Sequence, residues 1–240
     1  MTRRRWIADQ VNGNRAVITG EHADHLIRVL RAQPGQKFEI STGSSVRTGT
    51  IVAMDGQRVE FALAEELPSA QELNVTVAMS IFKFDRMEWA IEKCTELGVT
   101  EIVPVIARRT DSHLASAAAK RVERWQRIVR EASEQSRRLR PPVITAPLRW
   151  NEAVLIPGDF RVLLSETEAE RSLPAAMERF TGGSITLAVG PEGGWTEEEE
   201  KAFVGAGWIP ASLSKTILRA ETAAIAAVSV VSAMKLATGH

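Results

Sequence analysis

Two loops near the end of the chain hold the residue types best suited to chemistry. The first, LAVGPEGGW at residues 187–195, runs from an apolar stretch into glycines 190, 193 and 194. The second, SLSKTILRAETA at residues 212–223, is basic and leads into a long apolar segment. Glycines at a strand end let a backbone approach a ligand, because no Cβ intervenes. Ligands of open α/β sheets bind beyond the carboxyl ends of the strands. We therefore predict a small-molecule pocket built mainly from backbone.

The elements that position these loops follow an α/β pattern. Apolar runs typical of strands alternate with helical segments after residue 72; the strands are expected at residues 73–82, 100–107, 161–165 and 184–189, and the helices include 85–97 and 221–237. This alternation predicts a mainly parallel sheet. Cys94 lies in the apolar stripe of its helix, so we expect it in the core, and Gly98 is expected to end that helix in a left-handed conformation.

The first part of the chain has a different pattern. Strand candidates at residues 38–40, 48–53 and 58–63 are separated by glycines, with one short helix expected near residues 22–31. Closely spaced strands of this kind suggest a small β-barrel. The polar connector LPSAQE, residues 67–72, marks the boundary. We therefore predict one domain over residues 1–70 and a second over residues 71–240.

Composition limits the function classes. The 240 residues are 44% hydrophobic and 25% charged, with one cysteine and a formal net charge of zero, which is ordinary for a globular protein. No apolar run reaches the roughly 20 residues of a membrane span, and the basic start lacks the apolar stretch of a secretory signal. We expect a cytoplasmic protein with no membrane contact, no disulfide and no bound metal, the His22 and His25 pair included.

Residues 117–140 form a local exception to the neutral charge, with eight basic and three acidic residues. We predict one basic helix ended by Pro141 and Pro142. Two interpretations stay open for it: a solvated face with pairs such as Arg127 to Glu131, or a nucleic-acid surface.

Four common catalytic and nucleotide-binding motifs are absent from the sequence. It has no G-x-G-x-x-G after a strand, no G-x-x-x-x-G-K-[ST], no H-E-x-x-H and no G-x-S-x-G, which argues against the usual dinucleotide, nucleotide-hydrolysing, zinc-protease and hydrolase sites. Thr196 and Glu199 predict a helix capping box. The acidic run at residues 197–200 is explained by that helix start, and we assign it no catalysis.

The two loops together resemble those of the ribosomal RNA small subunit methyltransferase E family, which belongs to the knotted (SPOUT) class of S-adenosylmethionine-dependent RNA methyltransferases. GPEGG followed by L-x-x-x-ILR-x-ETA is a specific pair, and the resemblance extends to EHADHLIRVLRAQPGQ, KFDRMEWAIEKCTELGVTEIVP and ERWQRIVREASEQSRRLRPP. The family's second loop usually reads L-G-x-R-ILR-x-ETA. Here Ser214 and Thr216 stand in place of the glycine and the arginine, which affects the cofactor contacts of that loop.

The resemblance implies a fold and a reaction. The fold is α/β: a C-terminal parallel-sheet domain with a trefoil knot, a small N-terminal PUA-like RNA-binding β-barrel, and a homodimer formed through the C-terminal helix. The reaction is methylation of ring nitrogen N3 of a uridine in 16S (small-subunit) ribosomal RNA by S-adenosyl-L-methionine, on the assembled small subunit. N3 must lose a proton, so a base or a positive group is expected nearby, and the uracil must be unpaired or flipped out.

The resemblance also assigns candidate residues. The catalytic candidates are Arg219 and Glu221, with a structural ion pair and a helix N-terminal charge as their respective alternatives. The cofactor-binding candidates are Leu164, Ser165, Glu166, Gly190, Pro191, Glu192, Gly193, Gly194, Leu213, Ser214, Lys215, Ile217 and Leu218. The RNA-binding candidates are Arg28, Arg31, Lys83, Arg86, Arg109, Gln135, Ser136 and Arg138. Lys83 and Arg86 have a second interpretation, as charges that accompany a helix start.

Two other functions remain open at this point. A knotted methyltransferase acting on the ribose 2′-hydroxyl differs only in the atom that lies beside the methyl group. A non-catalytic RNA-binding ribosome-assembly factor would have lost the cofactor, and Ser214 and Thr216 are the residues that favour it.

Overall fold

The structure, a computed structural model, describes residues 4–68 and 74–238. Its contacts divide the chain into two units. The first holds the described residues up to 68 together with residues 130–141; the second holds residues 74–129 and 142–238. The connector predicted at residues 67–72 lies outside the described residues from position 69 onward. The sequence pattern places residues 130–141 with the second domain, whereas the contacts group them with the first unit.

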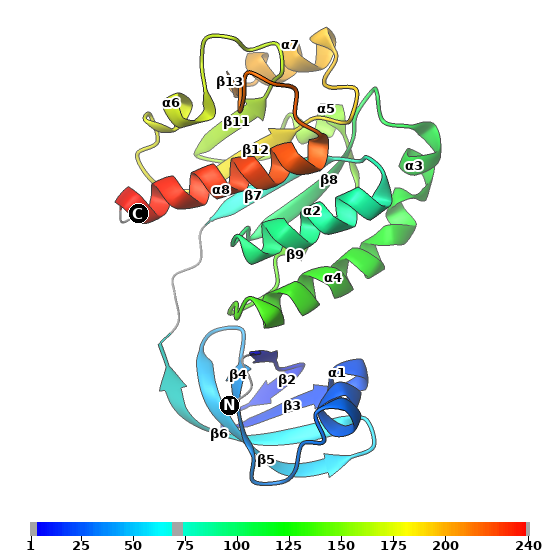
Figure 1. The fold of residues 1–240 in the computed structure, drawn as a ribbon, viewed down its shortest axis with the longest axis vertical. Helices are drawn as coiled ribbons and strands as arrows, with labels where there is room; N and C mark the ends of the chain where they lie inside the picture. Colours follow the sequence, from blue (N-terminus) through cyan, green and yellow to red (C-terminus); the bar gives the residue numbers. More distant parts are fainter. Residues whose placement is uncertain (1–3, 69–73, 239–240) are drawn as a thin grey trace. The chain divides into compact units, whose positions relative to one another are not determined.

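The first unit contains a curled sheet of six strands (Figure 1). The order is β1 (Trp6–Ile7), β4 (Lys37–Ser41), β5 (Val46–Asp55), β6 (Arg58–Leu67), β3 (Arg15–Thr19) and β2 (Gln10–Asn12). β1 pairs with β4 in parallel and the other pairs are antiparallel. The expected β-barrel is therefore a mixed half-barrel with β1 and β2 at its edges. The sequence pattern missed β1, β2 and β3, which are two to five residues long.

Large apolar side chains fill the inside of this curled sheet, among them Trp6, Leu26 and Phe61. The helix expected near residues 22–31 lies two residues earlier in the chain: α1 (Gly20–Asp24) continues as a π-helical segment, η1 (His25–Val29). The sheet passes close to itself at Gly49, where a Cβ would lie 2.4 Å from Ile40 Cγ1.

A buried carboxylate ties residues 130–141 to the rest of the first unit. Glu134 is fully buried and lies 2.5 Å from Arg4 Nη2 and 3.2 Å from His22 Nδ1. Arg130 reaches Asp9 at 2.6 Å. Buried charges are tolerated when they are paired, so these contacts explain why the segment groups with strands far away in the sequence.

The second unit contains the predicted parallel sheet, and every strand pair in it is parallel. Its order is β10 (Leu148–Arg149), β8 (Glu101–Ile106), β7 (Val75–Ser80), β12 (Ile185–Val189), β11 (Phe160–Leu164) and β13 (Ile209–Ala211), with β9 (Val143–Ile144) also paired to β8. The central strand β7 is buried along its whole length, as expected for a sheet covered on both faces.

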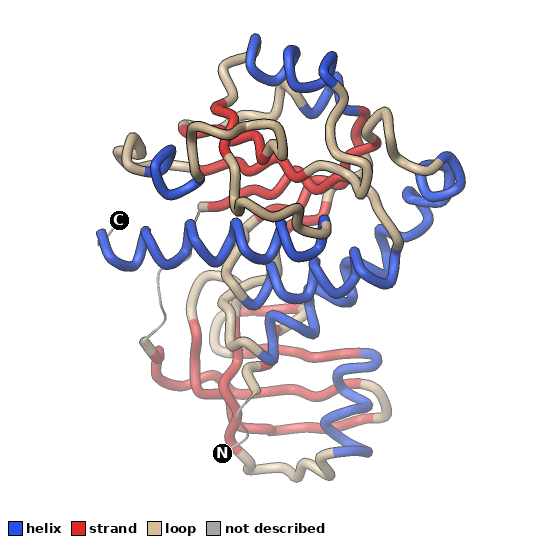
Figure 2. Tube along the Cα trace, turned by 45° about the horizontal axis from the view of Figure 1, so that its top comes forward, coloured by secondary structure: helices blue, strands red, loops and turns tan. Residues whose placement is uncertain are grey.

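Helices cover both faces of this sheet (Figures 1 and 2). One face packs against α2 (Phe84–Glu96), the start of α4 (Val122–Gln135), α6 (Leu173–Met177) and α8 (Ala220–Thr238). The other face packs against α5 (Trp150–Ala153) and α7 (Glu197–Gly205). Val77 and Ala78 are neighbours in β7 and belong to the two opposite cores, which is the period-two alternation of a strand.

Two predictions about α2 are confirmed. Cys94, on the buried face of this helix, is fully buried in the core. Gly98, which follows it, has φ +99°, and the amide of Val99 bonds to the carbonyl of Cys94 at 3.2 Å. Glycine takes this conformation without a steric penalty, so the helix ends there.

The single basic helix predicted for residues 117–140 is wrong in extent. The segment begins at the last residue of α3 (Ser112–Ala117) and continues through a 3-10 turn, η2 (Ala118–Arg121), into α4, which ends at Gln135. The helix stops before Pro141 because Arg137 adopts a left-handed φ of +62°. No helix in the described ranges is long and apolar enough to cross a membrane. The trefoil knot implied by the resemblance stays a prediction.

Candidate functional site

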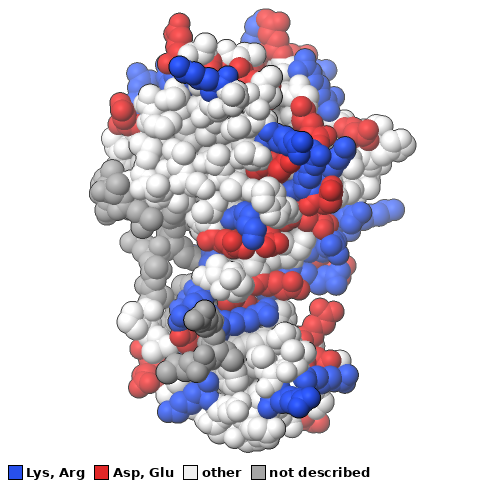
Figure 3. Space-filling view, viewed as in Figure 1, with Lys and Arg blue, Asp and Glu red and all other residues white. Residues whose placement is uncertain are grey.

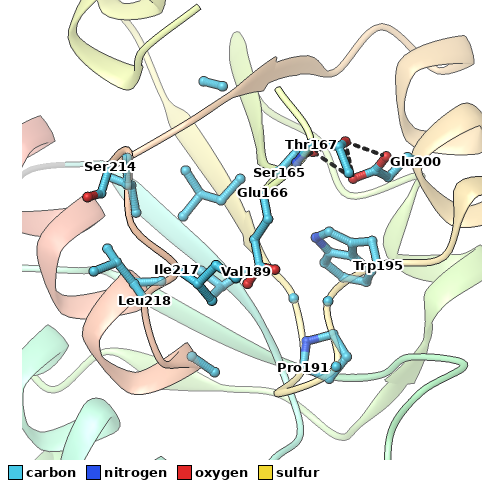
Figure 4. Close-up of a pocket in the computed structure, with 18 of the residues that line it drawn as sticks. Ser165, Glu166, Thr167, Val189, Pro191, Trp195, Glu200, Ser214, Ile217 and Leu218 are labelled. Carbon is cyan, nitrogen blue, oxygen red and sulfur yellow. Dashed lines mark hydrogen bonds between the residues drawn. The ribbon is translucent and has the colours of Figure 1, made fainter. Parts of the chain in front are cut away.

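A pocket lies where three neighbouring parallel strands end (Figure 4). Its walls are residues 164–167 after β11, 189–195 after β12 and 211–218 after β13, completed by Arg109, Glu200 and the start of α8. Parallel strands bring their carboxyl ends to one edge, so the loops converge there. Of the thirteen residues predicted to bind cofactor, twelve line this pocket, and Glu192 is the exception.

The glycine loop of residues 190–194 leaves room where side chains would close the pocket. A Cβ on Gly190 would meet the Trp195 indole at 3.2 Å, and a Cβ on Gly193 would meet Arg109 Cδ at 3.3 Å. Gly194 has φ +67°, and its amide bonds to the carbonyl of Pro191 at 2.9 Å. The loop therefore forms a tight cradle that presents backbone to a ligand.

Arg109 holds this loop from the neighbouring strand. It follows β8, and its Nη1 donates to the carbonyls of Gly193 at 2.6 Å and Trp195 at 3.2 Å. The preceding amide, that of Arg108, donates to Glu199 Oε1 at 2.7 Å. The resemblance predicts that Arg109 binds RNA. The structure places it in the pocket wall as a donor to the loop backbone, and an RNA contact stays a prediction.

The predicted capping box at the start of α7 is confirmed. Thr196 Oγ1 accepts from the amide of Glu199, and the Glu199 carboxylate accepts from the amide of Thr196. The sequence assigns the rest of the acidic run to this helix start as well, and for Glu200 that assignment is incomplete. Its carboxylate lines the pocket and accepts from Ser165 Oγ at 2.6 Å and Thr167 Oγ1 at 3.1 Å (Figure 4). In the sequence, the hydroxyl residues Ser165 and Thr167 after β11 are the signal that could have indicated this contact.

Trp195 closes the glycine loop on its inner side. It is 7% exposed and packs on Phe203, with ring centroids 5.1 Å apart. Within the described residues its indole Nε1 is buried without a hydrogen-bond partner. A buried donor without an acceptor is costly, so a polar ligand atom at this wall would satisfy it. This donor and the glycine cradle fit a polar small molecule such as S-adenosylmethionine.

The third loop contains the two departures from the family's usual motif. Ser214 Oγ and Thr216 Oγ1 lie 2.9 Å apart, and the amide of Thr216 donates to Ser214 Oγ at 3.1 Å. The two residues thus form a local turn that keeps the backbone of the loop against the pocket. Ile217, also in this loop, is 83% exposed.

The catalytic candidates lie beside the pocket rather than in its lining. Arg219 is exposed and immediately precedes α8. Glu221 is 5% exposed, in the first turn of that helix; its Oε1 is 3.8 Å from Arg86 Nε, and its Oε2 is buried without a hydrogen-bond partner among the described residues. Arg86 also contacts Glu192 Oε1 at 3.3 Å. The structure therefore joins Glu221 and the glycine loop through one guanidinium.

The other RNA-binding candidates are distributed over both units. Lys83 is exposed at the start of α2. In the first unit, Arg28 is exposed and pairs with Asp24 at 3.0 Å, and Arg31 is exposed with φ +51°. The group near the end of α4 is mixed: Gln135 is exposed, Ser136 donates its hydroxyl to Ala132 at 2.7 Å, and Arg138 is only 8% exposed.

The basic side chains of α4 form their ion pairs mainly with other elements. Arg124 contacts Glu88 of α2 at 2.7 Å, and Arg130 contacts Asp9 at 2.6 Å. No Arg127 to Glu131 pair is present in the described part of the chain, although both side chains are exposed. Ion pairs within the protein therefore neutralise part of the positive charge of residues 117–140.

Comparison with known proteins places the chain near one family. The sequence model of an RNA methyltransferase domain matches residues 69–232. A ribosomal RNA small subunit methyltransferase E from Synechocystis is 33% identical over 94% of this chain and 75% of the relative. The crystal structure of a ribosomal RNA small subunit methyltransferase E from Neisseria gonorrhoeae, bound to S-adenosyl methionine, has a TM-score of 0.84 at 32% identity, covering 98% of this chain and 97% of the other. A putative methyltransferase from Legionella pneumophila, in complex with the same cofactor, has a TM-score of 0.83 at 28% identity, covering 96% of each chain.

Proposed function

The chain belongs to the ribosomal RNA small subunit methyltransferase E family, and from this premise we propose that it methylates ring nitrogen N3 of a uridine in 16S ribosomal RNA, with S-adenosylmethionine as donor. The observation that carries the proposal is the convergence of the three strand-end loops on one pocket with a glycine cradle. The cofactor-bound relatives and the buried Trp195 donor support the cofactor assignment.

The chain's own residues would bind the cofactor and accept the proton that uracil N3 loses. The backbone of residues 190–194 and 213–218 would bind and orient it, and when bound it supplies an electrophilic methyl group on a sulfonium. The N3–H proton of uracil would pass to the Glu221 carboxylate, whose Oε2 lacks a hydrogen-bond partner within the described residues. The exposed guanidinium of Arg219 would stabilise the negative charge that develops on the uracil oxygens.

The test compares ribosomal RNA from a deletion strain before and after complementation. Mass spectrometry should show that the wild-type gene restores one 3-methyluridine. Glu221→Gln and Arg219→Ala should each lower the modification at least tenfold, whereas Glu178→Gln, an exposed carboxylate elsewhere in this unit, should restore it fully. A ribose methyl that disappears and returns instead would establish the 2′-O-methyltransferase.

Calorimetry with S-adenosylmethionine separates the enzyme from a non-catalytic assembly factor. The wild-type protein should release binding heat. A protein that binds ribosomal RNA and gives no heat with the cofactor is the assembly factor, and the local turn at Ser214 and Thr216 would then be part of the reason.

We also propose the surroundings in which the enzyme works. Residues 1–70 would form a PUA-like RNA-binding domain, and residues 71–240 the methyltransferase domain. The enzyme would act in the cytoplasm on the assembled small subunit. Two copies associate through α8. An uncharged area over this helix supports the dimer (Figure 3). Of the apolar residues of α8, Ala226, Val230 and Met234 are half-buried and Ala233 is exposed.

A further inference from the structure

We propose that Glu200 is a positioning residue that fixes two walls of the cofactor pocket against each other and thereby sets the affinity for S-adenosylmethionine. The proposal rests on the function proposed above. It concerns a carboxylate that the sequence pattern assigns to a helix start, and that the structure places in the pocket lining.

A small hydrogen-bond network joins Glu200 to Ser165 and Thr167. Ser165 is 6% exposed and donates its hydroxyl to Glu200 Oε1 at 2.6 Å. Thr167 Oγ1 lies 3.1 Å from Glu200 Oε2, and the two hydroxyl oxygens are 2.9 Å apart. The amide of Thr167 donates to Ser165 Oγ at 3.2 Å. Hydrogen bonds to a charged acceptor are stronger than neutral ones, so the carboxylate dominates this network.

The other three carboxylates of the acidic run have partners outside the pocket. Glu199 completes the capping box with Thr196. Glu197 pairs with Lys201 at 2.5 Å, and Glu198 pairs with Arg108 at 2.5 Å. Glu200 alone of the four lines the pocket. The helix start therefore explains the position of its neighbours and leaves the contacts of Glu200 to be explained by the pocket.

These bonds join segments that must keep a fixed separation for a ligand to fit between them. Residues 165–167 follow β11, whereas Glu200 is in the first turn of α7, which directly follows the glycine loop. In Figure 4 the bonds from Ser165 and Thr167 to Glu200 run along one edge of the pocket, with Glu166 and Trp195 beside them. Without the carboxylate, two hydroxyls lose their acceptor and both walls are free to move apart.

The main experiment is calorimetry with S-adenosylmethionine on wild type, Glu200→Ala and Glu200→Gln. Loss of two bonds to a charged acceptor should raise the Kd of Glu200→Ala about tenfold. Glu200→Gln keeps one acceptor oxygen and should lie between. Glu197→Gln, in the same helix turn and exposed, is the matched control and should bind as wild type. In turnover assays the KM of Glu200→Ala for S-adenosylmethionine should rise by about the same factor as its Kd and by more than kcat falls, because the lost bonds hold the walls of the cofactor pocket.

Two further measurements separate positioning from a general loss of stability. Ser165→Ala removes the bond from the other side, so its effect should be less than additive with Glu200→Ala, and it replaces Glu200→Ala if that variant does not fold. Hydrogen exchange without cofactor should show faster exchange at the amide of Thr167 in Glu200→Ala and no change in Glu197→Gln.

The outcomes are distinct. Wild-type affinity for the cofactor in Glu200→Ala, strict additivity with Ser165→Ala, or an equal loss in Glu197→Gln would overturn the proposal. If wild type itself gives no binding heat with S-adenosylmethionine, the proposed function fails, and the exchange at Thr167 still decides whether Glu200 fixes the wall.

Discussion

Cys94 is a side chain whose chemistry is determined by its surroundings. It lies in α2 and is fully buried, and burial raises the pKa of its thiol to about 12. The thiolate is the reactive form, so at pH 8 almost none is present in the folded protein. We expect iodoacetamide at pH 8 to leave the native protein unlabelled over hours and to label it fully in denaturant, as measured by intact-protein mass spectrometry. Rapid native labelling would contradict the burial of this residue.

Arg109 gives a second prediction at the residue scale. Its guanidinium donates to two carbonyls of the glycine loop, so Arg109→Ala should loosen the loop and raise the Kd for S-adenosylmethionine about tenfold. Calorimetry measures the change. Arg108→Ala is the matched control, because the side chain of Arg108 contacts Glu198 and only its amide contacts Glu199. Equal affinities in the two variants would remove Arg109 from the role described for it.

What the sequence predicts about single residues depends on how local their roles are. Gly190 and Gly193 are recognisable because a glycine at a strand end, having no Cβ, indicates a close approach of the backbone to a ligand. Glu200 was missed because its partner Ser165 lies 35 positions away, in the loop that follows β11. The contact of Arg109 with Gly193 spans 84 positions. Such contacts exist only after the sheet brings β8, β11 and β12 to the same edge.

The capping box of α7 links an element to the site. Thr196→Ala removes the acceptor for the amide of Glu199, and loss of an N-cap oxygen typically lowers the free energy of unfolding by about 1 kcal/mol. Chemical denaturation should detect this loss, and Thr196→Ser should recover most of it. Equal stability of the alanine and serine variants would show that the hydroxyl contributes little.

The sheet of the first unit gives a larger effect. At Gly49 a Cβ would lie 2.4 Å from Ile40 Cγ1 and 3.3 Å from Phe61 Cβ. Gly49→Ala should therefore lower the free energy of unfolding by about 1–3 kcal/mol through overpacking. Gly205→Ala is the control, because a Cβ there meets nothing within 4 Å. Denaturant titration of both variants provides the comparison.

Elements were predictable where they are long and regular. The strands and helices of the second unit follow the expected alternation. The predicted basic helix is interrupted by the 3-10 turn η2, and it ends early because Arg137 turns left-handed. Neither feature changes the hydrophobic period. β1 and β2, of two and three residues, are too short for alternation to identify.

At the scale of the whole molecule, the proposed association of two copies through α8 can be tested. Ala233 is an exposed residue of α8. Burying an unpaired charge in an interface is costly, so Ala233→Arg should shift a dimer to monomer in sedimentation velocity. Glu178→Arg, at an exposed position outside α8, should leave the sedimentation coefficient unchanged. A wild-type protein that sediments as a monomer at micromolar concentration would contradict association through α8.

Binding of the first unit to RNA should depend on salt. Arg28 and Arg31 are exposed there, and removing one arginine that binds a phosphate lowers the slope of log K against log salt by about 0.7 to 0.9. The double variant Arg28→Ala, Arg31→Ala should thus bind RNA more weakly and with a slope lower by about one to two. Arg58→Ala is the control, because Arg58 is an exposed arginine of the same unit that is not among the RNA-binding candidates. Fluorescence titration at several salt concentrations tests both, and an unchanged slope in the double variant would exclude these arginines as phosphate ligands.

The burial of Glu134 has a consequence for how this protein can be divided. Residues 130–141 group with the first unit although 56 residues of the second unit, 74–129, precede them. A fragment that stops at the connector would lack Glu134 and Arg130, and Arg4, His22 and Asp9 would be left without these partners. No single cleavage of the backbone releases a complete first unit, so neither unit can be cut out or exchanged intact as one continuous segment.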